Sequence, residues 1–353
     1  MKIKIDHIDK IEGHAGFVAK IVNGDVEAAK IEIEQGKRLI EKLLIGRKYD
    51  EAPIISSRVC GICPTVHQIT SIAAIENAFG VKPRPETIRW RRIMLYAQIV
   101  QSHGFHLFLL SMDKKILPVR DFANRLLEII GGRAVHPITP EVGGFKKIPE
   151  KKAIKRLMKD YDLVLKEAGK LTFRFKNQPK FYRLTAFKAL DEVYCGKEKT
   201  SEKNNKLFML GALARVNLYS DKLNPKAKKL LNLKLPCHNP FMNTYCQAIE
   251  IVHFLEEIGK EIKQIRFTDQ KVKYKVKAGA GTAVCEAPRG TLYHSYVIDK
   301  NGFIKKADLL TPTAQFIPNL EADLKKYVGR TRDEAKIRKL IRAYDPCITC
   351  AVR

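Results

Sequence analysis

Hydrophobic residues recur along this chain with two different periods, and the period distinguishes strands from helices. Alternation over residues 17–22 and 26–33 predicts two strands, and Asn23-Gly24 between them is a strong signal for a tight hairpin. Apolar residues spaced by three or four positions predict helices over residues 36–46, 66–79, 85–112, 118–130, 149–168 and 244–265. The pattern therefore predicts a mainly α fold of the α+β class, with a helical-bundle core and peripheral β-hairpins.

The second half of the chain mixes both periods. Residues 271–277 alternate like a strand, and residues 293–304 have the pattern of a hairpin. Thr331 and Glu334 have the spacing of a capping box, which predicts that the last helix begins there. Residues 172–240 are rich in Lys, Asn and Pro and support no assignment.

Two C-x-x-C motifs lie at opposite ends of the chain. Cys60 and Cys63 lie near its start, and Cys347 and Cys350 lie just before its end. Each motif directs its two thiolates toward one point, so two motifs that meet in the fold supply a four-sulfur metal site. Most of the protein must then be a scaffold that brings the two ends together.

This requirement bears on the domain organisation. Independent domains would separate the two cysteine pairs, so we expect one intertwined domain over residues 1–353. Within it we expect a β-hairpin region over about residues 1–36, a helical core, and a metal-binding tail over about residues 345–353.

Spacing alone leaves the chemistry of these sulfurs open. It slightly favours structural zinc, although the two pairs of a zinc ribbon normally lie within roughly 15–20 residues of each other. Rubredoxin-like iron and two separate redox dithiols fit the spacing as well. Zinc would close the site as a saturated tetrahedron and has no redox chemistry.

The charge of the chain raises the question of a nucleic-acid partner. Lys+Arg 65 and Asp+Glu 38 give a formal net charge of +27. The basic residues are spread along helices and lysine-rich loops, without a basic arm or a recognisable nucleic-acid-binding motif. We therefore expect a solvated lysine-rich surface and no nucleic-acid partner, with an acidic redox partner or an anionic cofactor as the alternative explanation.

Cysteine usage and hydropathy indicate a reducing, aqueous compartment. The 8 cysteines include the two C-x-x-C pairs and do not suggest a disulfide framework for a chain this long. The first residues lack the apolar core of a signal peptide, and no run of about 18 apolar residues could span a bilayer. We expect a cytoplasmic protein with no direct membrane insertion.

The residues around the cysteines change the ranking of these alternatives. R-V-C-G-I-C-P-T-V-H at 58–67 and D-P-C-I-T-C-A-V-R at 345–353 resemble the paired signatures of the large subunit of nickel–iron hydrogenases. I-E-G-H at 11–14 and E-A-P-R-G-T-L-Y-H at 286–294 resemble two further motifs of that family, in the same order. Four motifs spread over nearly the whole chain are more specific than either cysteine pair. The P-T-V-H continuation is most similar to the cytoplasmic, cofactor-coupled branches.

The resemblance implies a nickel–iron centre. All four sulfurs would bind nickel, and Cys63 and Cys350 would also bridge to an iron that carries carbon monoxide and cyanide. Cys60 and Cys347 would be terminal nickel ligands. The expected activity is the reversible, heterolytic cleavage of H2 into protons and electrons. Because no cysteine spacing for an iron–sulfur cluster remains, the electrons would pass to an iron–sulfur small subunit, and a flavin- or ferredoxin-linked subunit is a further expected partner.

The resemblance also implies roles for four residues. Cys347 would accept the first proton, and Glu12 would pass that proton outward. Arg289 would lie over the open metal position, where positioning is favoured over a role as base because a guanidinium is very hard to deprotonate. His67 would hydrogen-bond a bridging sulfur and tune the metals. By residue type alone, Glu12 would be a solvated or capping residue and Arg289 part of an ordinary salt bridge.

Several positions depart from the family pattern or are expected to be structural. Glu41 falls where the family has a carboxylate near a magnesium or iron ion, but the usual C-terminal histidine is replaced by Arg353, so an Arg353–Glu41 ion pair is the alternative. Ser102 stands near a point where some relatives carry an acid. His103 and His106 are expected to be hydrogen-bonded core groups.

The four remaining cysteines have no cluster-binding spacing. We expect Cys195, Cys237, Cys246 and Cys285 to be small buried hydrophobic residues, although Cys285 lies close in sequence to Arg289.

Three other functions compete with the hydrogenase. The chain could be a non-catalytic structural or coupling subunit of the same fold, like the respiratory complex I relatives that lost the cysteines. A structural zinc protein and a dithiol oxidoreductase are the other two. The presence of all four cysteines favours the enzyme, and bound nickel and iron would distinguish it from the zinc protein.

Overall fold

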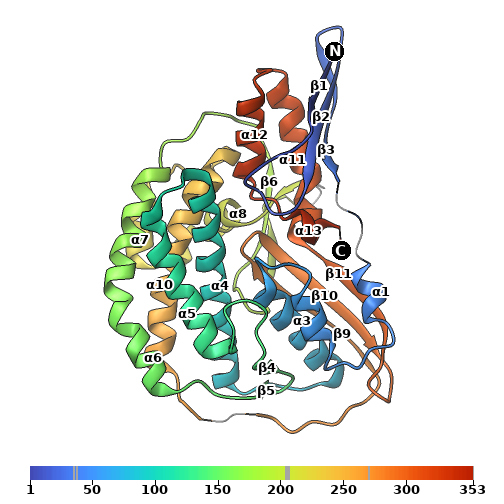
Figure 1. Cartoon of the computed structure of the whole chain (residues 1–353), viewed down its shortest axis with the longest axis vertical. Helices are drawn as coiled ribbons and strands as arrows, with labels where there is room; N and C mark the ends of the chain where they lie inside the picture. Colours follow the sequence, from blue (N-terminus) through green and yellow to red (C-terminus); the bar gives the residue numbers. More distant parts are fainter. Residues whose placement is uncertain (35, 37–38, 203–206, 269–270, 353) are drawn as a thin grey trace.

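Long helices form the core of the protein, and antiparallel strands lie at its edges (Figure 1). The computed structural model describes residues 1–34, 36, 39–202, 207–268 and 271–352. The long helices are α3 (Pro64–Phe79), α4 (Pro85–Ser111), α5 (Leu117–Gly131), α7 (Tyr161–Phe175), α10 (Asn243–Gln264) and α11 (Pro312–Val328). The predicted mainly α fold of the α+β class is confirmed. Of the predicted helices, those over residues 66–79, 85–112, 118–130 and 244–265 agree with the structure to within two residues at each end.

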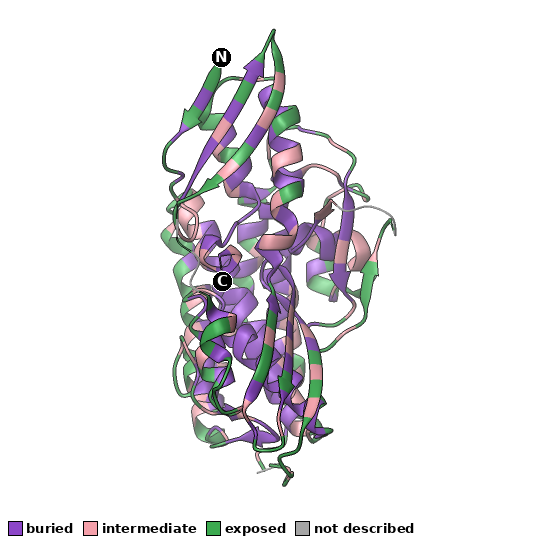
Figure 2. Ribbon diagram, turned by 90° about the vertical axis from the view of Figure 1, so that its right-hand side faces the viewer, coloured by how far each residue is buried: buried purple, intermediate pink, exposed green. Residues whose placement is uncertain are grey.

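Helix α4 is the central helix of the bundle and packs between α5 and α10. Trp90, Ile93 and Leu107 on it are fully buried. By length and composition alone α4 could cross a membrane, but 78% of its most apolar window is buried inside the protein. Figure 2, in which buried residues are purple, shows that helices in the interior of the protein are largely buried, and most residues of α4 are buried. Its hydropathy is therefore that of a core helix.

The N-terminal sheet confirms the first predicted hairpin. Strands β1 (Lys2–Ile5), β2 (Ala15–Val22) and β3 (Asp25–Ile33) pair antiparallel in the order β1-β2-β3. Asn23 and Gly24 both adopt positive φ, as the tight turn requires. Strand β1 was not expected from the sequence. The sheet lies beside α11 in Figure 1, where Glu321 accepts hydrogen bonds from Lys30 Nζ at 2.8 Å and Ile31 N at 3.1 Å.

A second antiparallel sheet covers α3. It consists of β9 (Gly279–Ala287), β10 (Gly290–Ile298) and β11 (Ile304–Leu310), in the order β11-β10-β9. The hairpin predicted over residues 293–304 is present, but its strands extend beyond those bounds. The strand predicted over 271–277 is wrong. These residues form an extended segment at the surface instead. The Val272 N–H donates to the Gly143 carbonyl oxygen and the Val272 side chain packs on the core, which accounts for the apolar residue between exposed lysines.

Three other predictions are corrected by local structure. Of the helix expected over residues 36–46, residues 37–38 lie outside the described residues, and the described part is helical over α1 (Ile40–Leu44), with Leu39 at a left-handed φ of 51° before it. The helix expected over 149–168 is divided into α6 (Lys151–Leu157), a 3₁₀ turn (Met158–Asp160) and α7. The predicted capping box at Thr331 is wrong, because the Asp333 carboxylate caps α12 (Glu334–Ala343) by accepting from two backbone N–H groups.

The smaller elements complete the fold. They include α2 (Ala52–Ser57), β4 (Pro140–Glu141), β5 (Gly144–Phe145), β6 (Ala186–Leu190), β7 (Glu198–Thr200), β8 (Phe208–Met209), α8 (Ala212–Tyr219), α9 (Pro225–Leu230) and α13 (Ile348–Ala351). Short 3₁₀ turns lie at Lys114–Ile116, Ser220–Lys222 and Pro240–Met242.

We expect Gly281→Ala to destabilise the protein by about 1–3 kcal/mol, the usual cost of overpacking. Strand β9 lies so close to α3 that a Cβ at Gly281 would be 2.2 Å from the Ala74 carbonyl oxygen. The two elements must therefore separate. Urea unfolding followed by circular dichroism measures the effect.

Gly169→Ala is the matched control for this substitution. A Cβ at Gly169, inside α7, would meet only Leu230 Cδ1 at 3.7 Å, and alanine favours a helix over glycine by about 1 kcal/mol. Equal stability of the Gly281→Ala protein and the wild type would contradict the tight contact.

Candidate metal centre

The two ends of the chain meet at the cysteine pairs. The Ile348 N–H donates to the Glu12 carbonyl oxygen at 2.8 Å, and Glu12 and Cys347 form a short parallel bridge. The N-terminal turn of α11 supports the same segment, because Thr313 Oγ1 accepts from the Cys347 N–H at 3.1 Å. The C-terminal tail is thus fixed between the N-terminal segment and α11.

The first pair is positioned by α3. Cys63 is the residue directly before this helix, and Pro64 occupies its first position, where the absence of an N–H carries no cost. The turn over residues 58–63 brings Cys60 to the same side, and Ile62 N–H donates to Cys60 Sγ at 3.2 Å.

The four cysteines form one buried cluster. Cys60 Sγ lies 3.3 Å from Cys347 Sγ, and Cys63 Sγ lies 3.4 Å from Cys350 Sγ. All four sulfurs lie within 4.8 Å of one another. In the part of the chain that the structure describes, this is the one group of three or more His, Cys, Asp or Glu ligand atoms close enough to hold a metal ion. The expected meeting of the two C-x-x-C motifs is present.

The sulfurs differ in their proton affinity. A hydrogen bond from Cys347 is the chief cause that holds the pKa of Cys60 well below that of an ordinary thiol. Burial raises the pKa of Cys347 well above it, and hydrogen bonding to Cys347 does the same to the pKa of Cys350. Four sulfurs this close cannot all ionise without a compensating cation. The cluster is therefore suited to a metal that replaces the thiol protons.

Glu12 lies directly beside the cluster. Its Oε2 accepts from Cys347 Sγ at 2.9 Å and from the Thr349 N–H at 3.1 Å. The Thr349 hydroxyl donates to Oε1. Both Glu12 and Thr349 are half-buried, so this carboxylate lies between the buried sulfurs and the surface. Sequence reasoning did not single out Thr349, which stands between the two cysteines of the second motif.

Arg289 lies on another side of the cluster. Its Nε donates to the Asp345 carbonyl oxygen at 2.7 Å, and Nη2 donates to Asp345 Oδ1 at 2.8 Å. Nη1 lies 3.4 Å from Ser102 Oγ. Burial alone would lower the pKa of Arg289, but Asp345 and the cysteines raise it well above its ordinary value. Arg289 therefore remains a cation.

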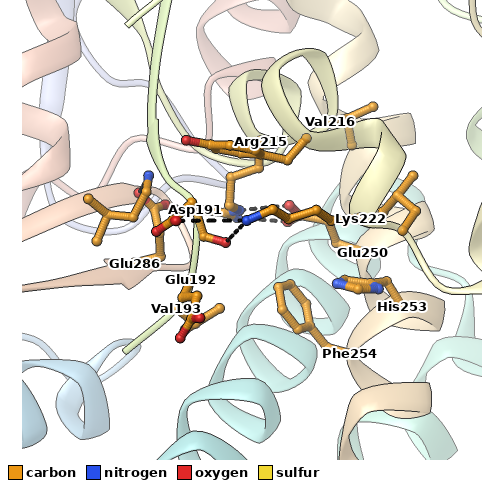
Figure 3. A pocket seen from close by; sticks show the side chains of 13 residues that line it. Asp191, Glu192, Val193, Arg215, Val216, Lys222, Glu250, His253, Phe254 and Glu286 are labelled. Atoms are coloured by element: carbon orange, nitrogen blue, oxygen red, sulfur yellow. Dashed lines mark hydrogen bonds and ion pairs between the residues drawn. The ribbon is translucent and has the colours of Figure 1, made fainter. Parts of the chain in front are cut away.

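A second buried arginine supports the loop that carries Arg289. Arg215 on α8 donates to both oxygens of Glu250 at 2.7 Å and to Glu286 Oε2 at 2.6 Å (Figure 3). It also donates to the carbonyl oxygens of Ala287 and Pro288, each at 3.0 Å. These contacts fix the backbone just before Arg289. Sequence reasoning missed Arg215, because a single arginine in a short helix carries no motif.

The same network borders a small cavity on the other side of the loop. The cavity has a volume of about 70 Å³, and Arg215, Glu250 and Glu286 line its inner wall (Figure 3). Lys222 reaches toward Asp191 there, with Nζ 3.1 Å from the Asp191 carbonyl oxygen. The charges around this cavity are paired within the protein.

A separate cavity adjoins the sulfurs themselves. It is lined by Cys63, His67, Ala287, Pro288, Arg289, Pro312, Thr313, Cys347 and Cys350. The centre of a water-sized sphere can occupy about 10 Å³ of this cavity, so the cavity has room for roughly one molecule of that size. A structural zinc site is closed by its four ligands, whereas this cluster has space on one side. The four thiolate donors fit a soft metal such as nickel, and the cavity leaves room for about one small group beside them.

His67 approaches the cluster from α3. Its Nε2 lies 3.6 Å from Cys350 Sγ, within reach of a hydrogen bond to sulfur. His103 and His106 are hydrogen-bonded core groups, as expected, and contact Glu250 at 2.8 Å and Gln247 at 2.7 Å.

Other expectations have mixed outcomes. Glu41 is half-buried in α1, and Arg353 lies outside the described residues, so their ion pair and a second metal near Glu41 stay predictions. Cys237, Cys246 and Cys285 are buried as expected. The expectation is wrong for Cys195, which is exposed because it lies in the connection between β6 and β7, with a left-handed φ of 50°.

Comparison with known proteins gives one consistent family. A model of the family described as nickel-dependent hydrogenase matches residues 38–113 and 238–353. The alpha subunit of sulfhydrogenase 1 from Pyrococcus furiosus is 28% identical, with 100% of this chain and 98% of that protein covered. An F420-non-reducing hydrogenase protein (vhu) of Methanocaldococcus jannaschii is 25% identical, over 91% of this chain and 97% of that protein.

Solved structures agree on the fold. An NAD+-reducing [NiFe]-hydrogenase in the H2-reduced state superposes with a TM-score of 0.86 at 21% identity, covering 100% of this chain and 99% of that chain. The Ni-Fe-Se hydrogenase from D. vulgaris Hildenborough gives a TM-score of 0.81 at 21% identity, with 100% of both chains covered. The resemblance inferred from the four sequence motifs is confirmed.

We expect Glu250→Gln to destabilise the protein by about 3 kcal/mol at pH 7. Burial alone would raise the pKa of Glu250, but Arg215 lowers it from 4.5 to about 2. A carboxyl with a depressed pKa stabilises the folded state above its unfolded pKa and loses that effect as the pH falls through the folded value. The difference between the two proteins should therefore fade between about pH 4.5 and pH 2, measured by urea unfolding at each pH.

Glu128→Gln, which changes an exposed carboxylate on α5, is the control. If the difference between wild type and Glu250→Gln stayed constant from pH 7 to pH 2, the Arg215–Glu250 pair would not be its source.

Proposed function

Because the chain belongs to the nickel-dependent hydrogenase family, we propose that it is the catalytic subunit of a nickel–iron hydrogenase. The reaction is H2 ⇌ 2 H⁺ + 2 e⁻. The observation that carries the proposal is the cluster of four buried sulfurs beside a cavity. When bound, nickel and iron would polarise the H–H bond and accept the two electrons of its heterolysis.

Cys60, Cys63, Cys347 and Cys350 would hold the metals. By the family's pattern, Cys60 and Cys347 would hold nickel, and Cys63 and Cys350 would hold both nickel and an iron with carbon monoxide and cyanide ligands. The cavity borders Cys63, Cys347 and Cys350, so it would supply room for a small group beside the metals.

The proton path begins at Cys347. This sulfur would take the proton released from H2, and Glu12 would receive it, since Glu12 Oε2 lies 2.9 Å from Cys347 Sγ. The N–H and hydroxyl of Thr349 both donate to this carboxylate, so they orient it toward the sulfur. From the half-buried Glu12 the proton would leave toward solvent.

Arg289 would act by charge and position rather than as a base. Its pKa is raised well above the ordinary value once Asp345 and the cysteines offset the effect of burial. Two hydrogen bonds to Asp345 hold the guanidinium against the cavity. A fixed cation there favours negative charge that develops on the substrate side of the centre.

The electrons need a partner, which we propose is an iron–sulfur small subunit. Exposed apolar side chains cluster on and beside α1 and α2, the segment that leads directly to Cys60; they are Leu39, Leu43, Ile45 and Ile54. A partner that covers this segment would bring its clusters close to the metals. A flavin- or ferredoxin-linked subunit would follow in a cytoplasmic complex.

Two further features belong to the same proposal. The chain would form a single domain over residues 1–353, which is supported by the contacts between Glu12 and the C-terminal cysteine segment. A magnesium or iron ion near Glu41 would be a second metal.

The runner-up function, a structural zinc protein or coupling subunit, is disfavoured by the cavity and by the carboxylate beside Cys347.

Infrared spectroscopy of the protein purified with its partners from its native host tests the centre. We expect bands of metal-bound carbon monoxide and cyanide in the wild type. Cys347→Ala should lose these bands, its nickel and all H2 turnover, because it removes one of four sulfur ligands. Cys237→Ala, a buried cysteine outside the cluster, should keep them. Metal-loaded wild type without such bands would refute the nickel–iron assignment.

Glu12→Gln tests the proton path. We expect metal content and infrared bands to remain, while H2/D2 exchange slows by about 100-fold or more, since an amide cannot carry the proton. Exchange is measured by mass spectrometry of the headspace gas. Glu27→Gln, on exposed β3, is the control. Normal exchange in Glu12→Gln would exclude Glu12 from the path.

A further inference from the structure

A chain of hydrogen-bonded side chains leads away from the sulfur of Cys350 into the sheet. His67 Nε2 lies 3.6 Å from Cys350 Sγ, and His67 Nδ1 lies 3.1 Å from His294 Nε2. His294 Nδ1 lies 2.9 Å from the Tyr296 hydroxyl, which lies 3.0 Å from Ser71 Oγ. Every group in the chain is buried.

The fold explains why these side chains meet. His294 and Tyr296 are two residues apart on β10, so both face α3. His67 and Ser71 are four residues apart on α3, so they lie on one face of this helix. Tyr296 pairs with Gly281 of β9, where the missing side chain allows the sheet to lie close to α3.

The donor and the acceptor of each hydrogen bond in this series follow from its end at Cys350. A metal-bound thiolate can only accept a hydrogen bond, so His67 Nε2 must carry the proton. Both rings are fully buried, and burial disfavours their charged form. His67 Nδ1 must then accept, His294 Nε2 must donate, and His294 Nδ1 must accept from the Tyr296 hydroxyl. Each step determines the next one.

Tyr296 is suited to the far end of this chain. Burial raises the pKa of its hydroxyl, so the group keeps its proton and remains a donor. Ser71 can donate to the same oxygen in turn. Hydrogen bonds that all point the same way polarise and strengthen one another.

We propose that His294 and Tyr296 are positioning residues that hold His67 in the tautomer whose Nε2–H faces the Cys350 sulfur. The inference rests on the proposed function, because it starts from Cys350 as a metal-bound thiolate. The donated hydrogen bond would withdraw electron density from a sulfur that would hold nickel and iron in the proposed centre. His294 and Tyr296 thereby tune the metals without touching them.

Infrared spectra of loaded variants test this inference. Without the hydrogen bond, Cys350 gives more electron density to iron, so the carbon monoxide band should move to lower wavenumber. We expect this shift in His294→Ala, and a smaller shift in the same direction in Tyr296→Phe, which removes a single oxygen atom. His294→Gln can still donate an amide N–H to His67 and should return the band toward its wild-type position. His294→Ala should also lose about 10- to 100-fold in nickel affinity or turnover.

Tyr293→Phe is the matched control. Tyr293 is the neighbour of His294 on β10, and its buried hydroxyl has no hydrogen-bond partner among the described residues. Its band position should equal that of the wild type.

Unchanged bands in both His294→Ala and Tyr296→Phe would overturn the inference, as would an equal shift in Tyr293→Phe. If His294→Ala assembles no metal centre, the carbon monoxide band of Tyr296→Phe tests the inference by itself, and an unshifted band would overturn it. Absence of bands in the wild type would instead refute the proposed function, so the two failures can be told apart.

Discussion

The rest of this structure depends on the convergence of four cysteine sulfurs that come from opposite ends of the chain. Thiols within 4.8 Å of one another cannot ionise together unless a cation joins them. Before a metal binds, the protein itself must hold them in place. The Glu12–Cys347 bridge and the Thr313 hydroxyl hold the backbone at Cys347, and α3 positions Cys63. The sulfur geometry therefore does not depend on flexible side chains alone.

Buried charged side chains around the cysteine cluster hold the neighbouring loop in place. Arg289 is held by Asp345, and Arg215 holds the carbonyls of the residues just before Arg289. Buried ion pairs contribute little net stability, but the loss of one partner is costly because a charge remains unpaired. The network of Arg215, Glu250 and Glu286 therefore acts mainly by allowing one arrangement of the loop. A cation beside the cavity can favour developing charge only if it does not move, and this network keeps it fixed.

The sequence predicted the parts of the molecule that local rules determine. The long helices have clear periods, the Asn23-Gly24 turn has its own signature, and the motifs identified the four cysteines and their neighbours. Predictions from local sequence patterns were wrong or incomplete where tertiary contacts determine the structure. Residues 271–277 alternate because they lie along the surface, and α1 begins only after Leu39, whose φ is left-handed. Arg215 and Thr349 could not be found, because their roles arise from neighbours distant in sequence.

The two sides of the cluster differ in the kind of hydrogen bond they offer. Cys347 faces a half-buried carboxylate, which can accept a proton and lies toward the surface. Cys350 faces a fully buried imidazole, whose Nε2–H would donate to a metal-bound thiolate and whose other nitrogen contacts His294. In the proposed reaction, a proton released at the centre would therefore be accepted on the Cys347 side. On the Cys350 side, the group that contacts the sulfur would be a donor and so would offer that proton no acceptor. In the proposed reaction, this asymmetry would give the proton one direction of exit, and the contact from His67 would act on the electron density of the metals.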